Sequence, residues 1–382
     1  MKTNDKLSTD RVASLLPQFL EAGLAGNTQR LELLSLTAIR SLRGEYPQLT
    51  DNIGAMLAKF SVNGDSLRWH NAEPPPVDAD AGLDLLRVIP ASDAVEPILA
   101  PSVQGAVTRF LGERVEAERL IREGIFPPRS LLLKGPPGTG KTMLAKWLAC
   151  KLGVPFVVLD LATSISSFLG KTGSNLRRSL DYARATPCLL LFDEFDSIAK
   201  RRDDATEIGE LKRIVNVLLK ELEDWPLKSV LVAATNHPDL LDPAIHRRFD
   251  VVIEMPMPGQ IEREAILLRS VCRFAETLKP AVVTALAQAL DGCNCSEVDT
   301  LAQGAVRRHL IEGVSLPQAL VVTVLQRLPD LSTDEVGRFV RTLKEGAGLS
   351  VREIAELVGK GSSTIQYYLT KKDRKRKGER HA

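Results

Sequence analysis

An eight-residue stretch, Gly135-Pro136-Pro137-Gly138-Thr139-Gly140-Lys141-Thr142, constrains the fold more than any other part of this chain. It follows the apolar run Leu131–Leu133, precedes a helical pattern and has the spacing Gly-x-x-x-x-Gly-Lys-[Ser/Thr]. In such a phosphate loop, glycines let backbone N–H groups converge on a polyphosphate, and the helix opening at Gly140 directs its positive dipole end at that anion. We expect Lys141 to neutralise the β- and γ-phosphates and Thr142 to offer its hydroxyl to Mg²⁺. The stretch therefore predicts a nucleoside triphosphate site.

Composition limits the class of protein without identifying it. The formal net charge of +2 gives no global bias toward nucleic acid, so any such signal has to be local. The five cysteines are odd in number and scattered, and no charged-then-apolar leader opens the chain, which favours a reducing cytoplasm. No apolar run approaches the ~18 residues that a membrane span needs. A length of 382 residues predicts two or three domains.

Five strand-like runs alternate with helical stretches in the middle of the chain. They are Ser130–Leu133, Phe156–Leu159, Leu189–Phe192, Val230–Ala234 and Val251–Met255. This alternation predicts βαβ units and an α/β fold, with a parallel five-stranded sheet covered by helices on both faces. Ligands of such sheets bind at the carboxyl ends of the strands, which is where the phosphate loop falls.

Helical patterns flank this α/β region. Before it, apolar positions at helical spacing predict a bundle with either a structural role or a docking role for a substrate or adaptor. The run Pro74-Pro75-Pro76 marks a linker, and helices dominate again beyond Pro258. The predicted parts are a helical domain at 1–70, a linker at 71–95, the α/β domain at 96–256, a small helical domain at 257–328, a trihelical domain at 329–370 and a basic tail at 371–382.

Two carboxylates follow the strand predicted at Leu189–Phe192. Asp193 and Glu194 come directly after it, about fifty residues beyond the phosphate loop. Asp193 suits a role in holding Mg²⁺, directly or through water, and Glu194 is placed to orient or deprotonate the water that attacks the γ-phosphate. Both are therefore expected at the sheet edge where the phosphate loop lies.

Polar residues also flank the last two predicted strands. Asn236 follows Val230–Ala234, where it either hydrogen-bonds the attacking water or the γ-phosphate, or caps the next turn. Arg247 and Arg248 stand just before the strand Val251–Met255. They are either a solvated basic turn or arginine fingers that reach the γ-phosphate of a neighbouring subunit.

A compact three-helix pattern follows Pro329. Its second helix ends at Gly359 and a serine caps the third, which is the form of a helix-turn-helix unit. Polar side chains lie off the apolar stripe of the third helix, where they can meet phosphates or base edges; they are Ser363, Thr364, Gln366 and Tyr367. The tail that opens with Lys371 and Lys372 holds seven Lys or Arg and two Asp or Glu, which attracts phosphate backbones. The pattern favours DNA binding over the alternative, a protein-binding helical trio with a basic tail.

Taken together, these motifs resemble those of the AAA+ ATPases over Glu96–Arg308, and more narrowly of the remodelling branch that includes katanin, spastin and the AAA proteases. In that family the phosphate loop is the Walker A motif, and Leu189–Glu194 matches the Walker B strand. Asn236 matches the sensor residue, and Arg247 and Arg248 match arginines that act in trans. The resemblance implies a P-loop module with a small helical lid, hydrolysis of ATP with Mg²⁺, and a ring, usually a hexamer, with ATP held between subunits.

Two further stretches are interpreted through the same resemblance. Phe168-Leu169-Gly170 has the aromatic-apolar-Gly form of the family's first pore loop, where an exposed aromatic binds a polypeptide regardless of its sequence. The alternative is that Phe168 is a core residue of the next helix. Cys295-Ser296 stands where the family's lid carries Gly-Ala, a departure at the expected contact with the nucleotide base, and no arginine there matches a second sensor.

Two functions from different classes follow. The first is an ATP-driven ring that remodels or unfolds a protein substrate, localised on DNA or paired with a separate protease, since the chain holds neither His-Glu-x-x-His nor Gly-x-Ser-x-Gly. The second is a DNA-handling ATP switch, such as a transposition or replication helper, in which Phe168 is incidental. The expected partners are further copies of the chain, a protein substrate or adaptor and DNA, without a membrane.

Overall fold

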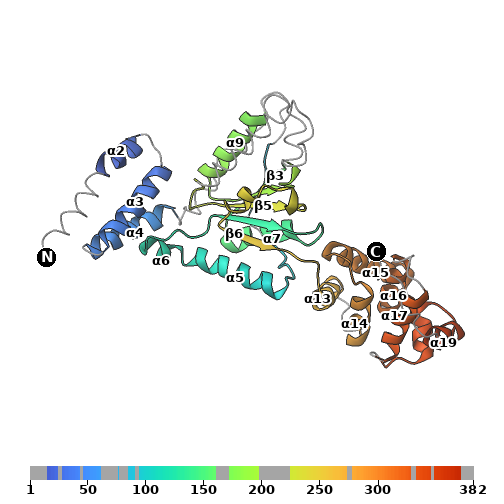
Figure 1. Ribbon diagram of the computed structural model, residues 1–382. Helices are drawn as coiled ribbons and strands as arrows, with labels where there is room; N and C mark the ends of the chain where they lie inside the picture. Colours follow the sequence, from blue (N-terminus) through green and yellow to red (C-terminus); the bar gives the residue numbers. More distant parts are fainter. Residues whose placement is uncertain are drawn as a thin grey trace, which may run out of the picture. The chain divides into compact units, whose positions relative to one another are not determined.

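The computed structural model describes residues 15–24, 28–43, 46–61, 76, 85–90, 94–160, 172–197, 224–272, 278–327, 333–345 and 348–370. They form two compact units. The first takes in the residues up to 97, 101–135 and 141–255, and the second takes in 98–100, 136–140 and the residues from 256 onward. Figure 1 follows the elements along the chain, from the blue amino-terminal helices to the red carboxyl-terminal ones.

The elements of the first unit are α2 (Leu16–Leu24), α3 (Thr28–Leu42), α4 (Pro47–Ser61), β1 (Arg87–Ile89), α5 (Pro101–Val115), α6 (Ala117–Arg122), β2 (Ser130–Lys134), α7 (Lys141–Leu152), β3 (Phe156–Asp160), α9 (Thr172–Ala185), β4 (Leu189–Asp193), β5 (Val230–Thr235), the 3-10 turn η2 (Pro238–Leu240), α12 (Pro243–His246) and β6 (Val251–Glu254). Those of the second unit are α13 (Gln260–Ser270), α14 (Pro280–Ala289), α15 (Cys295–Glu312), α16 (Leu316–Arg327), α17 (Thr333–Glu345), α18 (Val351–Val358) and α19 (Ser362–Thr370).

One sheet organises the first unit, with six strands in the order β1-β3-β4-β5-β2-β6. The five predicted strands are present within one residue of their expected bounds and run parallel to one another. A sixth strand, β1, pairs antiparallel with β3 at the edge, so the sheet is mixed and the expectation of a wholly parallel five-stranded sheet is corrected. Its three residues fall in the stretch predicted as a linker, because so short an extended segment carries no readable periodicity.

Strand β2 lies between β5 and β6, and Leu131–Leu133 are fully buried there. Successive side chains of a strand point to opposite faces, so a run this apolar needs cover on both faces. Helix α7 contacts β3, β4 and β5, and α5 packs against α7 and β6. Helix α9 contributes Leu176, Leu180 and Ala183 to a core cluster with the sheet, and Figure 1 shows α5 and α9 on opposite sides of it. This layering is the predicted α/β arrangement.

Helix α4 of the amino-terminal bundle packs against both α3 and α6. Ile39 of α3, Ile121 of α6 and Leu227, which precedes β5, are fully buried in one hydrophobic cluster. Arg40 donates from Nε to the carbonyl oxygen of Gly124 at 2.7 Å. These contacts attach the bundle to the segment that leads from α6 into β2.

A single hydrophobic core runs through the second unit from α13 to α19. It includes Leu286 of α14, Leu320 of α16, Val340 of α17 and Ile365 of α19, each of which is at most 1% exposed. The helices predicted as two regions, 257–328 and 329–370, therefore contribute to the same core. Side chains that interdigitate in this way resist relative displacement, because each void that opens forfeits dispersion attraction between its walls.

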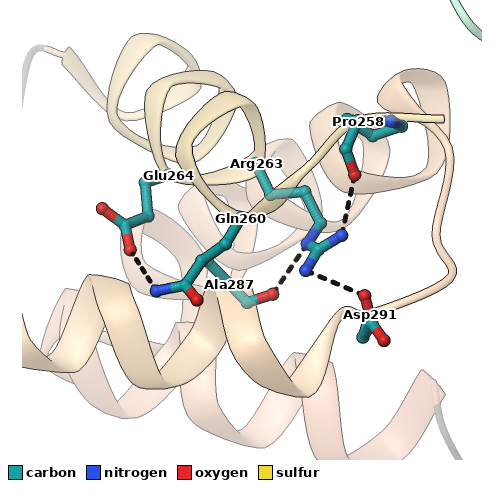
Figure 2. A network of polar contacts seen from close by, with 6 residues as sticks. All are labelled: Pro258, Gln260, Arg263, Glu264, Ala287 and Asp291. Carbon is teal, nitrogen blue, oxygen red and sulfur yellow. Dashed lines mark hydrogen bonds and ion pairs between the residues drawn. The ribbon is translucent and has the colours of Figure 1, made fainter. Parts of the chain in front are cut away.

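Arg263, a buried residue of α13, organises the polar contacts at the start of the second unit's helices (Figure 2). Its guanidinium donates to the carbonyl oxygens of Ala287 (2.8 Å) and Pro258 (2.7 Å) and pairs with the Asp291 carboxylate (3.0 Å). The planar fork of donors on arginine suits three acceptors in different directions. One side chain thus joins the segment that enters α13 to the carboxyl end of α14.

We expect the Arg263→Ala variant to lower the free energy of unfolding by about 2 kcal/mol, because two buried carbonyl oxygens are then without their donor. Urea denaturation of the full chain, followed by circular dichroism, measures the change. Gln260→Ala is the matched control: it removes an exposed contact to Glu264 in the same region (Figure 2) and should change stability by less than ~0.5 kcal/mol. Equal losses of stability in the two variants would contradict the role given to Arg263.

Candidate active site

The phosphate loop begins at Gly135, where the backbone leaves β2. The residue has a φ of +152°, and a Cβ placed on it would lie 2.1 Å from the carbonyl oxygen of Met255. Its N–H donates to the carbonyl oxygen of Thr235 at 3.3 Å, and the N–H of Met255 donates to that of Lys134 at 2.7 Å. The end of β2 is therefore enclosed by the ends of β5 and β6, and only glycine fits the first loop position.

The middle of the loop, residues 136–140, belongs to the second unit and contacts the amino end of α15 there. The N–H of Ser296 donates to the carbonyl oxygen of Gly138 at 3.1 Å, and the Asn294 side chain fills the place where a Cβ of Gly138 would stand. Asn294 also caps α15, because its side chain accepts the N–H of Glu297 at 2.9 Å. The position that departs from the family pattern, Cys295-Ser296, thus meets the loop through a backbone N–H.

The other loop residues have varied environments. The Thr139 hydroxyl donates to the carbonyl oxygen of Pro136 at 2.9 Å, and the Thr139 side chain is buried. Pro136 and Pro137 are exposed. Gly140 has a φ of +93°, and α7 begins directly after it at Lys141, one residue later than the sequence predicts.

The Lys141 side chain is buried and turns back toward the start of the loop. Its Nζ donates to the carbonyl oxygen of Gly135 at 2.8 Å. Burial lowers the pKa of the Lys141 ammonium below its ordinary value, and the negative charges of Asp193 and Asp196 act against that shift. A cation in this place lies at the carboxyl edge of the sheet, where an anionic ligand is expected to bind.

Thr142 and Asp193 lie side by side, as the sequence predicts. The Thr142 hydroxyl donates to Oδ2 of Asp193 at 3.1 Å. Hydroxyl and carboxylate oxygens are the ligand types that Mg²⁺ prefers, and Mg²⁺ commonly takes one or two protein ligands with water and phosphate oxygens. The pair fits that chemistry. Within the described ranges, no group of three or more His, Cys, Asp or Glu side chains could hold a metal ion.

Glu194 has an exposed side chain directly after β4. Its φ is +51°, the only positive value among the described residues other than glycine. Its N–H donates to Oδ1 of Asp193 at 3.0 Å. A non-glycine residue in the left-handed region costs of order 1–3 kcal/mol and persists where the surroundings hold it, which is common at functional sites. The two carboxylates therefore stand next to each other at the sheet edge and face different environments.

Asn236 follows β5, the neighbour of both β4 and β2. Its N–H donates to Oδ1 of Asp196 at 3.2 Å, and the Thr235 hydroxyl donates to the same oxygen at 3.1 Å. Asp196 is buried and was missed by the sequence reasoning. The available signal was a third acid in the run Asp193-Glu194-Phe195-Asp196, which periodicity does not distinguish from a solvent-exposed residue.

Arg247 and Arg248 are exposed. They precede β6, and so they lie at the edge of the sheet opposite to the one that carries the phosphate loop. Val251 of β6 pairs with Leu131 near the start of β2, and Asp250 accepts the N–H of Ser130 at 2.9 Å. The arginines precede these residues, so their backbone lies at the amino ends of β6 and β2, whereas the phosphate loop follows the carboxyl end of β2. The structure therefore does not bring the arginine pair to the cluster around Lys141.

Some of the remaining predicted residues lie in the second unit, and the others lie outside the residues that the structure describes. Ser363, Gln366 and Tyr367 are exposed on α19, and Thr364 is half-buried. The pore-loop triplet, Phe168, Leu169 and Gly170, and the tail residues Lys371 and Lys372 lie outside the described residues.

Comparison with known proteins adds three findings. The family model of the ATPase family associated with various cellular activities (AAA) matches residues 131–257. The uncharacterized AAA family ATPase y4kL of Sinorhizobium fredii is 34% identical over 226 residues, which are 59% of this chain and 68% of that protein. The ATP-dependent zinc metalloprotease FtsH of Acidothermus cellulolyticus is 38% identical over 196 residues, which are 49% of this chain and 29% of that protein.

Among solved structures, the crystal structure of the FIGL-1 AAA domain matches 74% of this chain and 98% of that domain, with a TM-score of 0.53 and 19% identity. At that identity the match concerns the fold alone. The chain covers less than a third of the FtsH relative, so the remainder of that protein has no counterpart in the match. In the part of the chain that the structure describes, no helix combines the length and apolar character needed to cross a membrane.

Proposed function

The chain belongs to the AAA family of ATPases, and we propose that it forms a ring in which ATP hydrolysis drives the remodelling or unfolding of a protein substrate. The observation that carries the catalytic part is the Thr142–Asp193 contact of 3.1 Å beside the buried Lys141. It joins the phosphate loop to the carboxylate that ends β4, which is what Mg-dependent phosphoryl transfer needs at one place.

Each residue has a distinct role in this proposal. Lys141 neutralises the β- and γ-phosphates, and Thr142 with Asp193 would hold Mg²⁺, which supplies charge neutralisation at the phosphates when bound. Glu194 accepts a proton from the water that attacks the γ-phosphorus, while the bond from that phosphorus to the ADP oxygen breaks. Asn236 orients the water or contacts the γ-phosphate. The products are ADP and phosphate.

We assign Arg247 and Arg248 to the active site of a neighbouring subunit. Their backbone position at the amino ends of β6 and β2, away from the chain's own phosphate loop, supports this assignment. A guanidinium supplied in trans stabilises the charge that develops on the transferred phosphoryl group. Head-to-tail contacts of this kind close into rings, and a hexamer is the size the family resemblance implies.

Subunit mixing tests both the roles and the ring. Lys141→Ala subunits and Arg247→Ala/Arg248→Ala subunits should each be inactive alone, since an arginine finger contributes ~10³–10⁵ in rate. An equimolar mixture should regain roughly a quarter of wild-type turnover, because about one interface in four pairs an intact loop with intact arginines. A steady-state phosphate-release assay measures the recovery.

The matched control mixes Lys141→Ala with Glu194→Gln subunits. Both residues act within one chain in this proposal, so no intact site forms and turnover should stay at background. Native mass spectrometry verifies that mixed assemblies are present. Recovery in this control, or none in the arginine mixture, would refute the assignment of residues to subunits.

Remodelling of a protein is favoured over the DNA-handling switch by two observations. One is that a relative of this chain is an ATP-dependent zinc metalloprotease, an enzyme whose name states that it acts on proteins. The other is the triplet Phe168-Leu169-Gly170, whose aromatic residue suits sequence-independent binding of a polypeptide. We further propose a protease as a candidate partner and the cytoplasm as the compartment.

The Phe168→Ala variant discriminates the two functions. A remodeller should lose unfolding of a tagged model substrate by at least tenfold while keeping its basal ATPase rate, because the substrate contact is removed and the hydrolytic site is not. Fluorescence loss of a folded reporter measures unfolding. Phe168→Tyr keeps an aromatic ring and should retain activity; equal unfolding rates in the wild type and Phe168→Ala would exclude the pore-loop role.

A second candidate function, DNA binding, is favoured by the geometry of α18 and α19. Ser350 and Glu353 form a capping box at the start of α18, and Gly359 ends it in the left-handed conformation with a φ of +67°. Helix α19 begins after a short turn and exposes Gln366 and Tyr367. Two short helices joined in this way, with polar side chains on the second, suit a major groove.

Deletion of residues 371–382 together with a salt titration tests this candidate. The wild type should bind a duplex with an affinity that falls steeply with salt. The deletion should weaken binding and flatten that slope by about 0.9 for each phosphate that the tail neutralises. Fluorescence anisotropy of a labelled duplex measures both. Affinity that responds neither to the deletion nor to salt would count against DNA as a partner.

A further inference from the structure

Asp196 lies in the turn after β4. It is 2% exposed, and a carboxylate removed from water to this extent is costly unless hydrogen-bond donors or cations surround it. Its partners show what this group does. Two of them, the Thr235 hydroxyl and the Asn236 N–H, come from the end of the neighbouring strand.

Oδ1 of Asp196 holds the segment after β5 in place. It accepts the Thr235 hydroxyl at 3.1 Å and the N–H of Asn236 at 3.2 Å. The Thr235 oxygen in turn accepts the N–H of His237 at 3.1 Å. Three successive residues are thus hydrogen-bonded, directly or through one hydroxyl, to a single carboxylate oxygen.

The turn that carries Asp196 also carries Glu194. The N–H of Ser197 donates to the carbonyl oxygen of Glu194 at 2.8 Å, which closes the turn. The N–H of Phe195 donates to the carbonyl oxygen of Ala234 at 2.9 Å, which joins the turn to the end of β5. Asp196 therefore lies between the two strand ends that present Glu194 and Asn236.

The apolar surroundings keep this turn in one position. Phe195 stacks on Phe192 of β4 with ring centroids 6.2 Å apart and meets the edge of Phe249 at 6.1 Å. All three rings belong to one buried cluster. The Asp196 charge also acts on Lys141, where together with that of Asp193 it opposes the effect of burial on the pKa of the ammonium. Asp196 thus acts on Asn236 through a hydrogen bond and on Lys141 through its charge.

We propose that Asp196 is a positioning residue for ATP hydrolysis, which holds the backbone of Asn236 at a fixed place relative to Glu194. The inference rests on the proposed function, because it takes Glu194 and Asn236 as the residues that act on the attacking water. A displacement of about 1 Å at such a group can cost on the order of 10²-fold in rate.

A double-variant cycle tests this role in the full chain. Asp196→Ala should lower kcat at least tenfold with little change in KM, and Asn236→Ala should do the same. The double variant should be no slower than Asn236→Ala alone, because residues that act as a unit are not additive. Asp196→Asn keeps an oxygen that can accept both hydrogen bonds and should recover kcat to within about threefold of the wild type.

Controls separate positioning from folding. Ser179→Ala removes another buried hydroxyl of the first unit, on α9, and should leave kcat unchanged. Should Asp196→Ala fail to fold by thermal melting, Thr235→Val replaces it in the cycle, since it removes one of the two hydrogen bonds at constant shape. Its effect should then likewise vanish in the Asn236→Ala background.

Failure of the positioning role and failure of the proposed ATPase function give different results in these experiments. Wild-type kcat in Asp196→Ala or in Thr235→Val, or losses that multiply with that of Asn236→Ala, would overturn the positioning role and leave the ATPase assignment intact. Wild-type turnover in both Glu194→Gln and Asn236→Ala would instead overturn the proposed catalytic residues. A drop in kcat in Asp196→Ala that Asp196→Asn does not recover would also overturn the role of the hydrogen bonds.

Discussion

The burial of the Lys141 ammonium is the constraint on which the rest of the site depends. A buried cation needs oxygen partners, and the structure supplies the Gly135 carbonyl at 2.8 Å with the charges of Asp193 and Asp196 nearby. These partners come from the ends of two strands: Gly135 follows β2, Asp193 ends β4 and Asp196 lies in the turn after β4. The order of the strands places β5 between β2 and β4, so its end, with Asn236, falls beside both.

The same sheet separates the arginine pair from the residues around Lys141. Parallel strands present their carboxyl ends at one edge, and the polar residues that follow β2, β4 and β5 gather there. Arg247 and Arg248 precede a strand instead, so they approach the opposite edge. A ring in which neighbours face each other head to tail reconciles the two positions, and this is the physical basis for proposing that arginines act between subunits.

The second unit combines helices that the sequence assigns to a lid and to a helix-turn-helix region. Because α14, α16, α17 and α19 contribute to one core, these helices are expected to move together when the unit moves. The phosphate loop enters this unit through Gly138, whose carbonyl oxygen accepts the Ser296 N–H. The start of α15 is thus in direct contact with the loop that is proposed to hold ATP.

Local sequence was sufficient to predict the fold class, the five parallel strands and the place of Asp193 at the sheet edge where the phosphate loop lies. Those features depend on spacing along the chain, because an apolar strand followed by a polar residue puts that residue at a known edge. Only the folded chain showed three features: the added strand β1, the edge of the sheet at which Arg247 and Arg248 lie, and the partners of Asp196. The three residues of β1 are too few to show a periodic pattern, and no pattern distinguishes Asp196 from a solvent-exposed acid. Pairing across a sheet and the burial of a charge depend instead on segments that are far apart in sequence, as for β1 with β3 and for Asp196 with Asn236.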